Sequence, residues 1–216
     1  MTILALEFSS PQRSVAVRCA RGGRDVAEAV ETGGRATNAF SLIEAVLSQA
    51  GIEREQIDAL AVGLGPGSYT GIRAAIAVAQ GWQLARGIKL LGVSSADCLA
   101  AQAHADKIFG RVSVVIDAQR NEFYLATYEI SGEGWREVEP LKILPAADVQ
   151  ARMDRGEILI GPEITRWFAP GRAIFPRAAA LAELGASRGE FNPGEKLEPI
   201  YLRETNFVKA ATFRGP

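Results

Sequence analysis

The spacing of apolar residues predicts an antiparallel unit at the start of the chain. Short apolar runs that are separated by turn residues indicate buried strands. Three such runs come first, at residues 2–8, 14–18 and 26–31. Consecutive strands joined by short turns pair with their neighbours, so we expect a three-stranded meander here.

The apolar period then changes. Phe40, Ile43, Leu47 and Ala50 recur at spacings of three and four, which predicts an amphipathic helix over residues 37–50. Strands and helices alternate after it. The expected elements are strands at 57–64 and 89–93 and helices at 74–85 and 95–103.

The second half of the chain repeats this order. The segment VSVVIDAQRNEFYLAT aligns with ILALEFSSPQRSVAV, and the alignment places Glu7 and Asp117 at matching strand ends. The later segments AVGLGP and ILIGP match as well. The elements expected in this half are strands at 111–117, 122–130, 135–144 and 157–161 and a short helix at 145–155.

A meander followed by alternating helix and strand is the order of a ribonuclease-H-like unit. Two such units that face a cleft make the actin-like (ASKHA) fold, which in many members holds ATP between the lobes. We therefore expect an α/β protein of this fold, with mixed sheets in two ribonuclease-H-like lobes. The predicted lobes are residues 1–105, with the interface helices, and residues 106–216.

The stretch GLGPGSYTGIR, residues 63–73, joins an expected strand to an expected helix. Glycines allow close approach to a phosphate at a helix N-terminus, and Ser68, Thr70 and Arg73 add donors, so anion binding is one interpretation. The stretch has no lysine for a P-loop, and its glycines miss the dinucleotide spacing by one residue. The pattern somewhat favours the other interpretation, a tight turn with Ser68 or Thr70 as the helix cap.

Glu7 and Asp117 are the candidate cleft carboxylates. In an actin-like cleft they would face Mg²⁺ and the phosphates of a nucleotide. The alternative is that each merely ends a strand, and for Glu7 we favour this because its side chain is longer than that of aspartate. Only the first half carries the full glycine loop, whereas a kinase needs phosphate loops from both halves.

Charge and composition exclude several classes of site. The net charge of −1 gives no overall basic footprint for nucleic acid, although a local patch is compatible with it. The chain has one histidine, His104, which cannot by itself support a serine triad or a histidine-based metal site. We expect no catalytic residues and no metal site.

Cysteine use and hydropathy indicate a reducing compartment. Cys19 and Cys98 are widely spaced and do not form a CxxC pair, so we expect two reduced thiols. The N-terminus has no basic region before its apolar run, and the chain has no apolar run long enough to span a membrane. We expect a cytoplasmic protein without a membrane partner.

Two expected helices are candidates for a partner surface. The segment GIRAAIAVAQGWQLARG is rich in alanine and glycine, and its apolar residues are spread too widely for one buried stripe. With FSLIEAVLSQA it forms either a surface for another subunit or a pair of helices covered within the chain. The sequence does not decide between these two arrangements.

Several motifs together resemble the TsaB (YeaZ) family. They are ILALEFSS with SVAV, IDALAVGLGPGSYTGIR, GWQLARGIKLLGVSS, VVIDAQRNEFYLATY and EPIYLRE, and they run along nearly the whole chain. GPGSYTGIR followed by GVSS is the most specific of them. Two departures weaken any expectation of nucleotide binding. The first strand ends in Glu7 where the family usually has Asp, and Thr37-Asn38 stands where the family often has a histidine.

The resemblance implies a non-catalytic scaffold. Such a protein binds TsaD through its two N-terminal helices and supports threonylcarbamoylation of adenosine 37 in tRNA. It also implies that TsaE, an ATPase, joins the complex and uses ATP, that tRNA is reached only through the complex, and that the chain forms a homodimer without TsaD. No cofactor is assigned to this chain itself. Periodicity and resemblance together predict seven partner-contact residues: Phe40, Ile43, Leu47, Ile72, Arg73, Ile76 and Gln80.

Two other functions stay open from the sequence. One is an ATP-dependent small-molecule kinase of the actin-like class, which would need a second phosphate loop and an acid placed as a base. The other is a self-contained homodimeric binding module.

Overall fold

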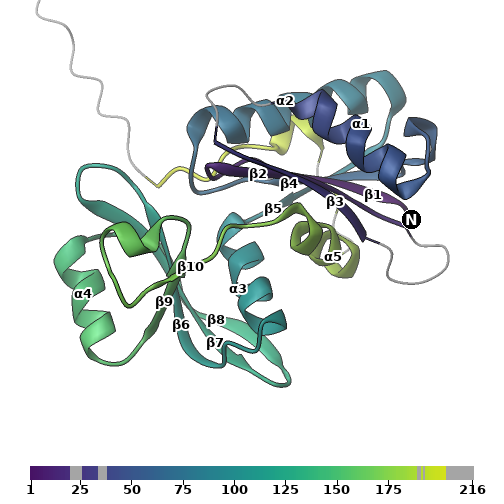
Figure 1. Cartoon of the computed structure of the whole chain (residues 1–216). Coiled ribbons are helices and arrows are strands. Elements are labelled where there is room, and N and C mark those ends of the chain that lie inside the picture. The colour runs from purple at the N-terminus through teal and green to yellow at the C-terminus, as the bar shows by residue number, and fades with distance from the viewer. Residues whose placement is uncertain (20–25, 34–37, 189–190, 192, 203–216) are drawn as a thin grey trace, which may run out of the picture.

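The computed structural model describes residues 1–19, 26–33, 38–188, 191 and 193–202. These residues form two lobes, each built on a five-stranded sheet (Figure 1). The first sheet contains β1 (Ile3–Glu7), β2 (Gln12–Arg18), β3 (Val26–Thr32), β4 (Ala59–Gly63) and β5 (Lys89–Val93). The second contains β6 (Gly110–Asp117), β7 (Glu122–Ser131), β8 (Gly134–Pro145), β9 (Ile158–Gly161) and β10 (Arg172–Ala173).

The two sheets have the same topology. Their strand orders are β3-β2-β1-β4-β5 and β10-β9-β6-β7-β8, which match when the second is read backwards. In each, the first strand pairs antiparallel with the second and parallel with the fourth. The repeat inferred from the sequence is therefore structural, and the predicted actin-like α/β fold is confirmed.

The helices cover the faces of the two sheets. They are α1 (Ala39–Ala50), α2 (Tyr69–Arg86), α3 (Ser95–Ala105), α4 (Ala146–Asp154) and α5 (Ala178–Arg188), with short 3₁₀ turns η1 (Arg54–Gln56), η2 (Ile164–Arg166) and η3 (Gly194–Lys196). Helices α1 and α2 lie on one face of the first sheet and α5 lies on its other face (Figure 1). The strands before and after residue 105 lie in different sheets. In contrast, α3 comes from the first half of the sequence but packs on the second sheet, and α5 comes from the second half but packs on the first sheet.

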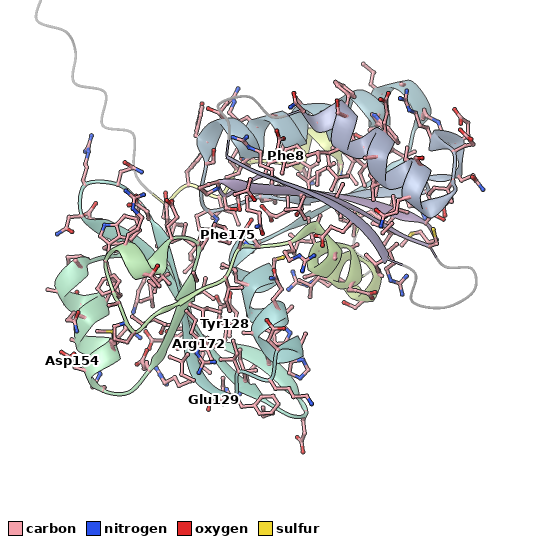
Figure 2. All side chains as sticks on the ribbon, viewed as in Figure 1. Phe8, Tyr128, Glu129, Asp154, Arg172 and Phe175 are labelled. Atoms are coloured by element: carbon pink, nitrogen blue, oxygen red, sulfur yellow. The ribbon has the colours of Figure 1, made fainter. Side chains whose placement is uncertain are left out.

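The central strand of the first sheet is buried on both faces. All five residues of β1 are inaccessible, which explains why this strand is a continuous apolar run that only Glu7 interrupts. Phe8 extends the core between the first sheet and the α1–α2 layer (Figure 2). In the other lobe Tyr128 lies between the second sheet and α3, where its hydroxyl donates to Asp97 at 2.9 Å (Figure 2).

The ends of α1 and α2 follow local rules. Gly51 and Gly87 end these helices in the left-handed conformation, with φ of 63° and 67°. Helix α2 begins at Tyr69 rather than at residue 74, because Ser68 caps it and accepts a hydrogen bond from the Gly71 amide. Asn38 precedes α1 without a side-chain cap, and Thr37, the other expected cap, lies outside the described residues.

A buried ion cluster supports α4 on the second sheet. The Arg152 side chain is almost inaccessible and donates to Glu139 at 2.6 and 2.9 Å and to Glu157 at 3.3 Å. It also donates to the buried Thr127 hydroxyl at 3.2 Å. Hydrogen bonds from Arg152 and then Lys142 hold the pKa of Glu139 well below its usual range.

Two further features bear on the setting of the protein. Within the described ranges, every helix is too short or too polar to cross a bilayer. Cys19 is half-buried and Cys98 is buried, and both are free thiols.

Candidate functional site

The glycine-rich loop between β4 and α2 is packed against its own chain. The Ser68 amide donates to the Ser9 carbonyl oxygen at 2.7 Å. A Cβ on Gly67 would overlap that same carbonyl, and a Cβ on Gly71 would overlap the carbonyl of Phe8. These glycines are therefore required for close contact with the segment after β1, and the tight-turn interpretation of the loop, with Ser68 as cap, is confirmed.

Glu7 is directed into the protein interior. It is completely inaccessible, and its two carboxylate oxygens accept from the Ser9 amide at 2.8 Å and the Ser95 hydroxyl at 2.9 Å. Gly63 lies against the same carboxylate, because a Cβ there would overlap it. Burial raises the pKa of Glu7, and the hydrogen bonds from Ser9 and Ser95 lower it in part. Glu7 therefore joins β1, β4 and α3 as a structural group.

The matching position in the second lobe is Asp117, which lines the cleft between the lobes. Its two oxygens accept from the Gln119 amide at 2.7 Å and the Gln119 side-chain nitrogen at 3.1 Å. The nearby Gly161, at the end of β9, is packed against the Val115 carbonyl and leaves no space for a Cβ. The loop after β4 is thus occupied by contacts within the chain, whereas Pro162 and Glu163, which follow β9, line the cleft.

These residues do not fit a magnesium–nucleotide held in the actin-like manner. Such a site needs carboxylates at both first-strand ends to face the metal, and Glu7 is buried away from solvent. It also needs free loop amides for phosphates, and the Ser68 amide is committed to Ser9.

The cleft itself is a substantial cavity of about 620 Å³. Loops from both lobes line it, and four aromatic side chains lie on its walls: Tyr69, Tyr124, Trp167 and Tyr201. Tyr201 comes from the C-terminal segment, which is fixed to the first lobe by a hydrogen bond from the Ile200 amide to the Leu64 carbonyl at 2.9 Å.

The structure divides the seven predicted contact residues into two groups. Four of them are core residues of the first lobe that pack between the sheet and the helices: Ile43, Leu47, Ile72 and Ile76. They are not available to a partner on the folded surface. The exposed group is Phe40, Arg73 and Gln80. Gln80 also has a role within the chain, because its side chain donates to the Gly194 carbonyl at 2.9 Å.

Three exposed residues of α2 that the sequence did not single out, Ala77, Gly81 and Leu84, extend the exposed group of predicted contacts. Leu84 is 91% exposed and Phe40 is 63% exposed, and Ala77 and Gly81 are exposed between Arg73 and Leu84 on α2. We call these five residues the outer helix face. A Cβ added to Gly81 would meet no atom within 4 Å, so nothing within the described chain requires a glycine there.

His104 is remote from this face and lies near the end of α3, with its ring 6.5 Å from that of Phe109. In the part of the chain that the structure describes, no three His, Cys, Asp or Glu side chains are grouped so that they could share a metal ion.

Comparison with known proteins identifies the family. A family model described as TsaD, tRNA N6-adenosine threonylcarbamoyltransferase, matches residues 35–187. The chain is 30% identical over 179 residues to the tRNA threonylcarbamoyladenosine biosynthesis protein TsaB of Escherichia coli, covering 75% of this chain and 78% of that protein. The chain belongs to the TsaB family. The TsaB protein of Bacillus subtilis is 27% identical over 94% of both chains.

The solved structures agree with this assignment. YeaZ from Pseudomonas aeruginosa superposes with a TM-score of 0.79 at 28% identity, and the match covers 93% of this chain and 99% of that one. The TsaB-family resemblance inferred from the sequence motifs is thus confirmed over nearly the whole chain.

Proposed function

We propose that this chain is a non-catalytic subunit of the machinery that makes threonylcarbamoyladenosine at position 37 of tRNA. It binds a TsaD-type protein through the outer helix face and supports the activity of that partner. A TsaE-type ATPase joins the assembly, and without TsaD the chain pairs with a second copy through the same face.

The observation that carries this proposal is the outer helix face itself. Leu84 and Phe40 are the most exposed large apolar side chains of the described residues, and apolar groups exposed together on a surface mark interaction sites. Gly81 lies in a helix interior, where glycine costs about 1 kcal/mol relative to alanine. Since no atom of the described chain needs the space, a close-packed partner helix is the best reason for a glycine at this position.

A non-catalytic role has separate support. The cleft that holds the reactants in related folds has its first carboxylate, Glu7, buried and its glycine loop packed on its own chain. The single histidine, His104, lies beside Phe109 rather than in the cleft. These features also count against the kinase interpretation, which needs two phosphate loops and an accessible acid.

A charge on the outer helix face should weaken the complex. Ala77→Glu places a carboxylate in the middle of this face, where a close-packed partner would have to desolvate it. We expect the affinity for the TsaD-type protein of the same organism to fall roughly tenfold or more, measured by sedimentation velocity of the mixed proteins.

The matched control is Ala151→Glu, which makes the same change at an exposed position of α4 in the other lobe. This variant should bind as the unchanged chain does. Equal affinities for Ala77→Glu and the unchanged chain would exclude this face as the binding surface. A homodimer that persists in excess TsaD-type protein would instead support the homodimeric binding module.

A further inference from the structure

We propose that the cleft between the lobes binds an unpaired nucleotide of RNA. Its base lies against the stacked rings of Tyr69 and Tyr201, which we call the tyrosine pair, and its phosphates lie at the rim of the cleft near Arg120 and Arg166. This inference rests on the proposed role in tRNA modification, and it adds a direct RNA contact to a chain otherwise expected to reach tRNA only through its partners.

The tyrosine pair offers an aromatic surface for a base. The rings of Tyr69 and Tyr201 are stacked, with centroids 5.3 Å apart and planes inclined by 26°. Both side chains line the cleft and about half of each is exposed, so the pair has an open face. On the second lobe Trp167 adds a further ring, held by an edge contact with Phe123. Stacking on such rings is how proteins hold single-stranded bases without regard to sequence.

Arginines surround these rings. The Arg73 guanidinium lies 5.3 Å from the centre of the Tyr69 ring, and its Nη1 donates to the Tyr69 hydroxyl at 3.2 Å. The Arg166 guanidinium lies 5.1 Å from the centre of the Trp167 ring. Arg120 is exposed in the turn beside the cleft. Arg120 takes part in none of the ion pairs of the described residues, so its charge is available to phosphate, whereas Arg73 belongs to the outer helix face and is covered when a partner occupies that face.

The acidic residues of the cleft are already engaged. Asp117 accepts hydrogen bonds from the amide and the side chain of Gln119. Glu163 is paired with Arg166 at 2.8 Å. Asp117 keeps its negative charge, but Arg13 and Arg120 place two positive charges at the cleft beside the paired Glu163 and Arg166, although the whole chain carries a net charge of −1. This local charge favours an anionic ligand and disfavours a basic peptide.

Backbone strain is concentrated at the same cleft. Five non-glycine residues of the described chain have positive φ, and four of them lie in the loops at the second-lobe wall: Gln119, Arg120, Asn121 and Glu163. Such conformations cost free energy and cluster where a loop must hold side chains for a ligand. The turn presents Arg120 outward while Gln119 lines the cavity.

The form of the ligand follows from what the cleft lacks. The glycine loop has its Ser68 amide bonded to Ser9, so this amide is not available to the phosphates of a free nucleotide. The arginines lie at the rim, with the rings on the walls. This arrangement suits a nucleotide whose phosphates continue along a strand outside the cavity.

The decisive variant is Tyr201→Ala, tested with a fluorescent RNA hairpin of the anticodon-arm sequence. Binding is measured by anisotropy for the chain alone and for its complex with the TsaD-type protein. Because the RNA base loses one of the rings on which it stacks, we expect the affinity for RNA to fall roughly fivefold or more, both for the chain alone and for the complex. Tyr201→Phe keeps the ring and should retain binding. A thermal unfolding midpoint equal to that of the unchanged chain shows that the variant is folded.

Charge variants give an independent comparison. Arg120→Gln should weaken RNA binding at low salt and reduce its salt dependence. Lys107→Gln is the matched control, because Lys107 is also an exposed cation with positive φ but lies at the end of α3. It should leave binding unchanged.

Other outcomes overturn the inference. Equal RNA affinity of Tyr201→Ala and the unchanged chain would do so, as would Tyr201-dependent binding of AMP or poly-glutamate in place of RNA. Complex formation without Tyr201-dependent RNA binding would leave the proposed function standing and reject only the RNA contact. Failure of the complex would reject the proposed function, and the chain-alone measurement would still decide the RNA contact.

Discussion

Replacing Gly71 by alanine is expected to lower the free energy of unfolding by about 3 kcal/mol or more. Gly71 lies in the first turn of α2, and a Cβ there would overlap the Phe8 carbonyl oxygen. Phe8 follows a fully buried strand, so neither backbone can move away without disturbing the core. Urea denaturation followed by circular dichroism measures the change.

The matched control is in the same helix. Gly81→Ala adds the same methyl group where nothing lies within 4 Å, and helix propensity should then raise the free energy of unfolding by about 0.5–1 kcal/mol. If both substitutions shifted the stability in the same direction, the close contact between α2 and the segment after β1 would not be as described.

Replacing Arg152 by methionine is expected to lower the free energy of unfolding by about 3 kcal/mol at neutral pH. The change leaves Glu139 and the largely buried Glu157 without the cation that binds both. The folded-state pKa of Glu139 is depressed, so its pairing contributes stability above the unfolded-state pKa, near 4.5, and this contribution is lost as the pH falls. The stability difference between the variant and the unchanged chain should therefore narrow below that pH.

Arg155→Met serves as the control for this cluster. Arg155 is an exposed residue at the end of α4, and it takes part in none of the ion pairs found among the described residues. Its loss should change the stability by less than about 0.5 kcal/mol. If Arg152→Met lowered the free energy of unfolding by no more than Arg155→Met does, the cluster would not stabilise the lobe.

The fold could be predicted from the sequence because its signals are local and occur twice. The apolar run of β1 and the three-and-four spacing of α1 each identify one element, and Gly51 and Gly87 mark helix ends. The alignment of Glu7 with Asp117, at matching strand ends of the two halves, identified the duplication that the sheet topology shows. The exchange of α3 and α5 between the lobes could not be predicted in this way, because it depends on contacts far apart in the sequence. Helix α5 itself was missed, since its alanine-rich segment has no clear apolar period.

The contact surface was only partly predictable, for a physical reason. Apolar spacing in an amphipathic helix identifies the side that packs on the sheet, and this is where Ile43, Leu47, Ile72 and Ile76 lie. A partner meets the opposite side, where small residues and isolated apolar residues give no periodic pattern. Gly81 was the available signal, because a glycine in a helix interior needs a reason. Tyr201 could not be placed at the cleft before the path of the C-terminal segment was known.

Amide hydrogen exchange of the chain, with and without the TsaD-type protein, tests the role of the outer helix face most directly. We expect slower exchange in the peptides that cover α1 and α2, and unchanged exchange in α4 on the other lobe. Slowed exchange confined to the second lobe, with α1 and α2 unaffected, would contradict the proposed mode of binding.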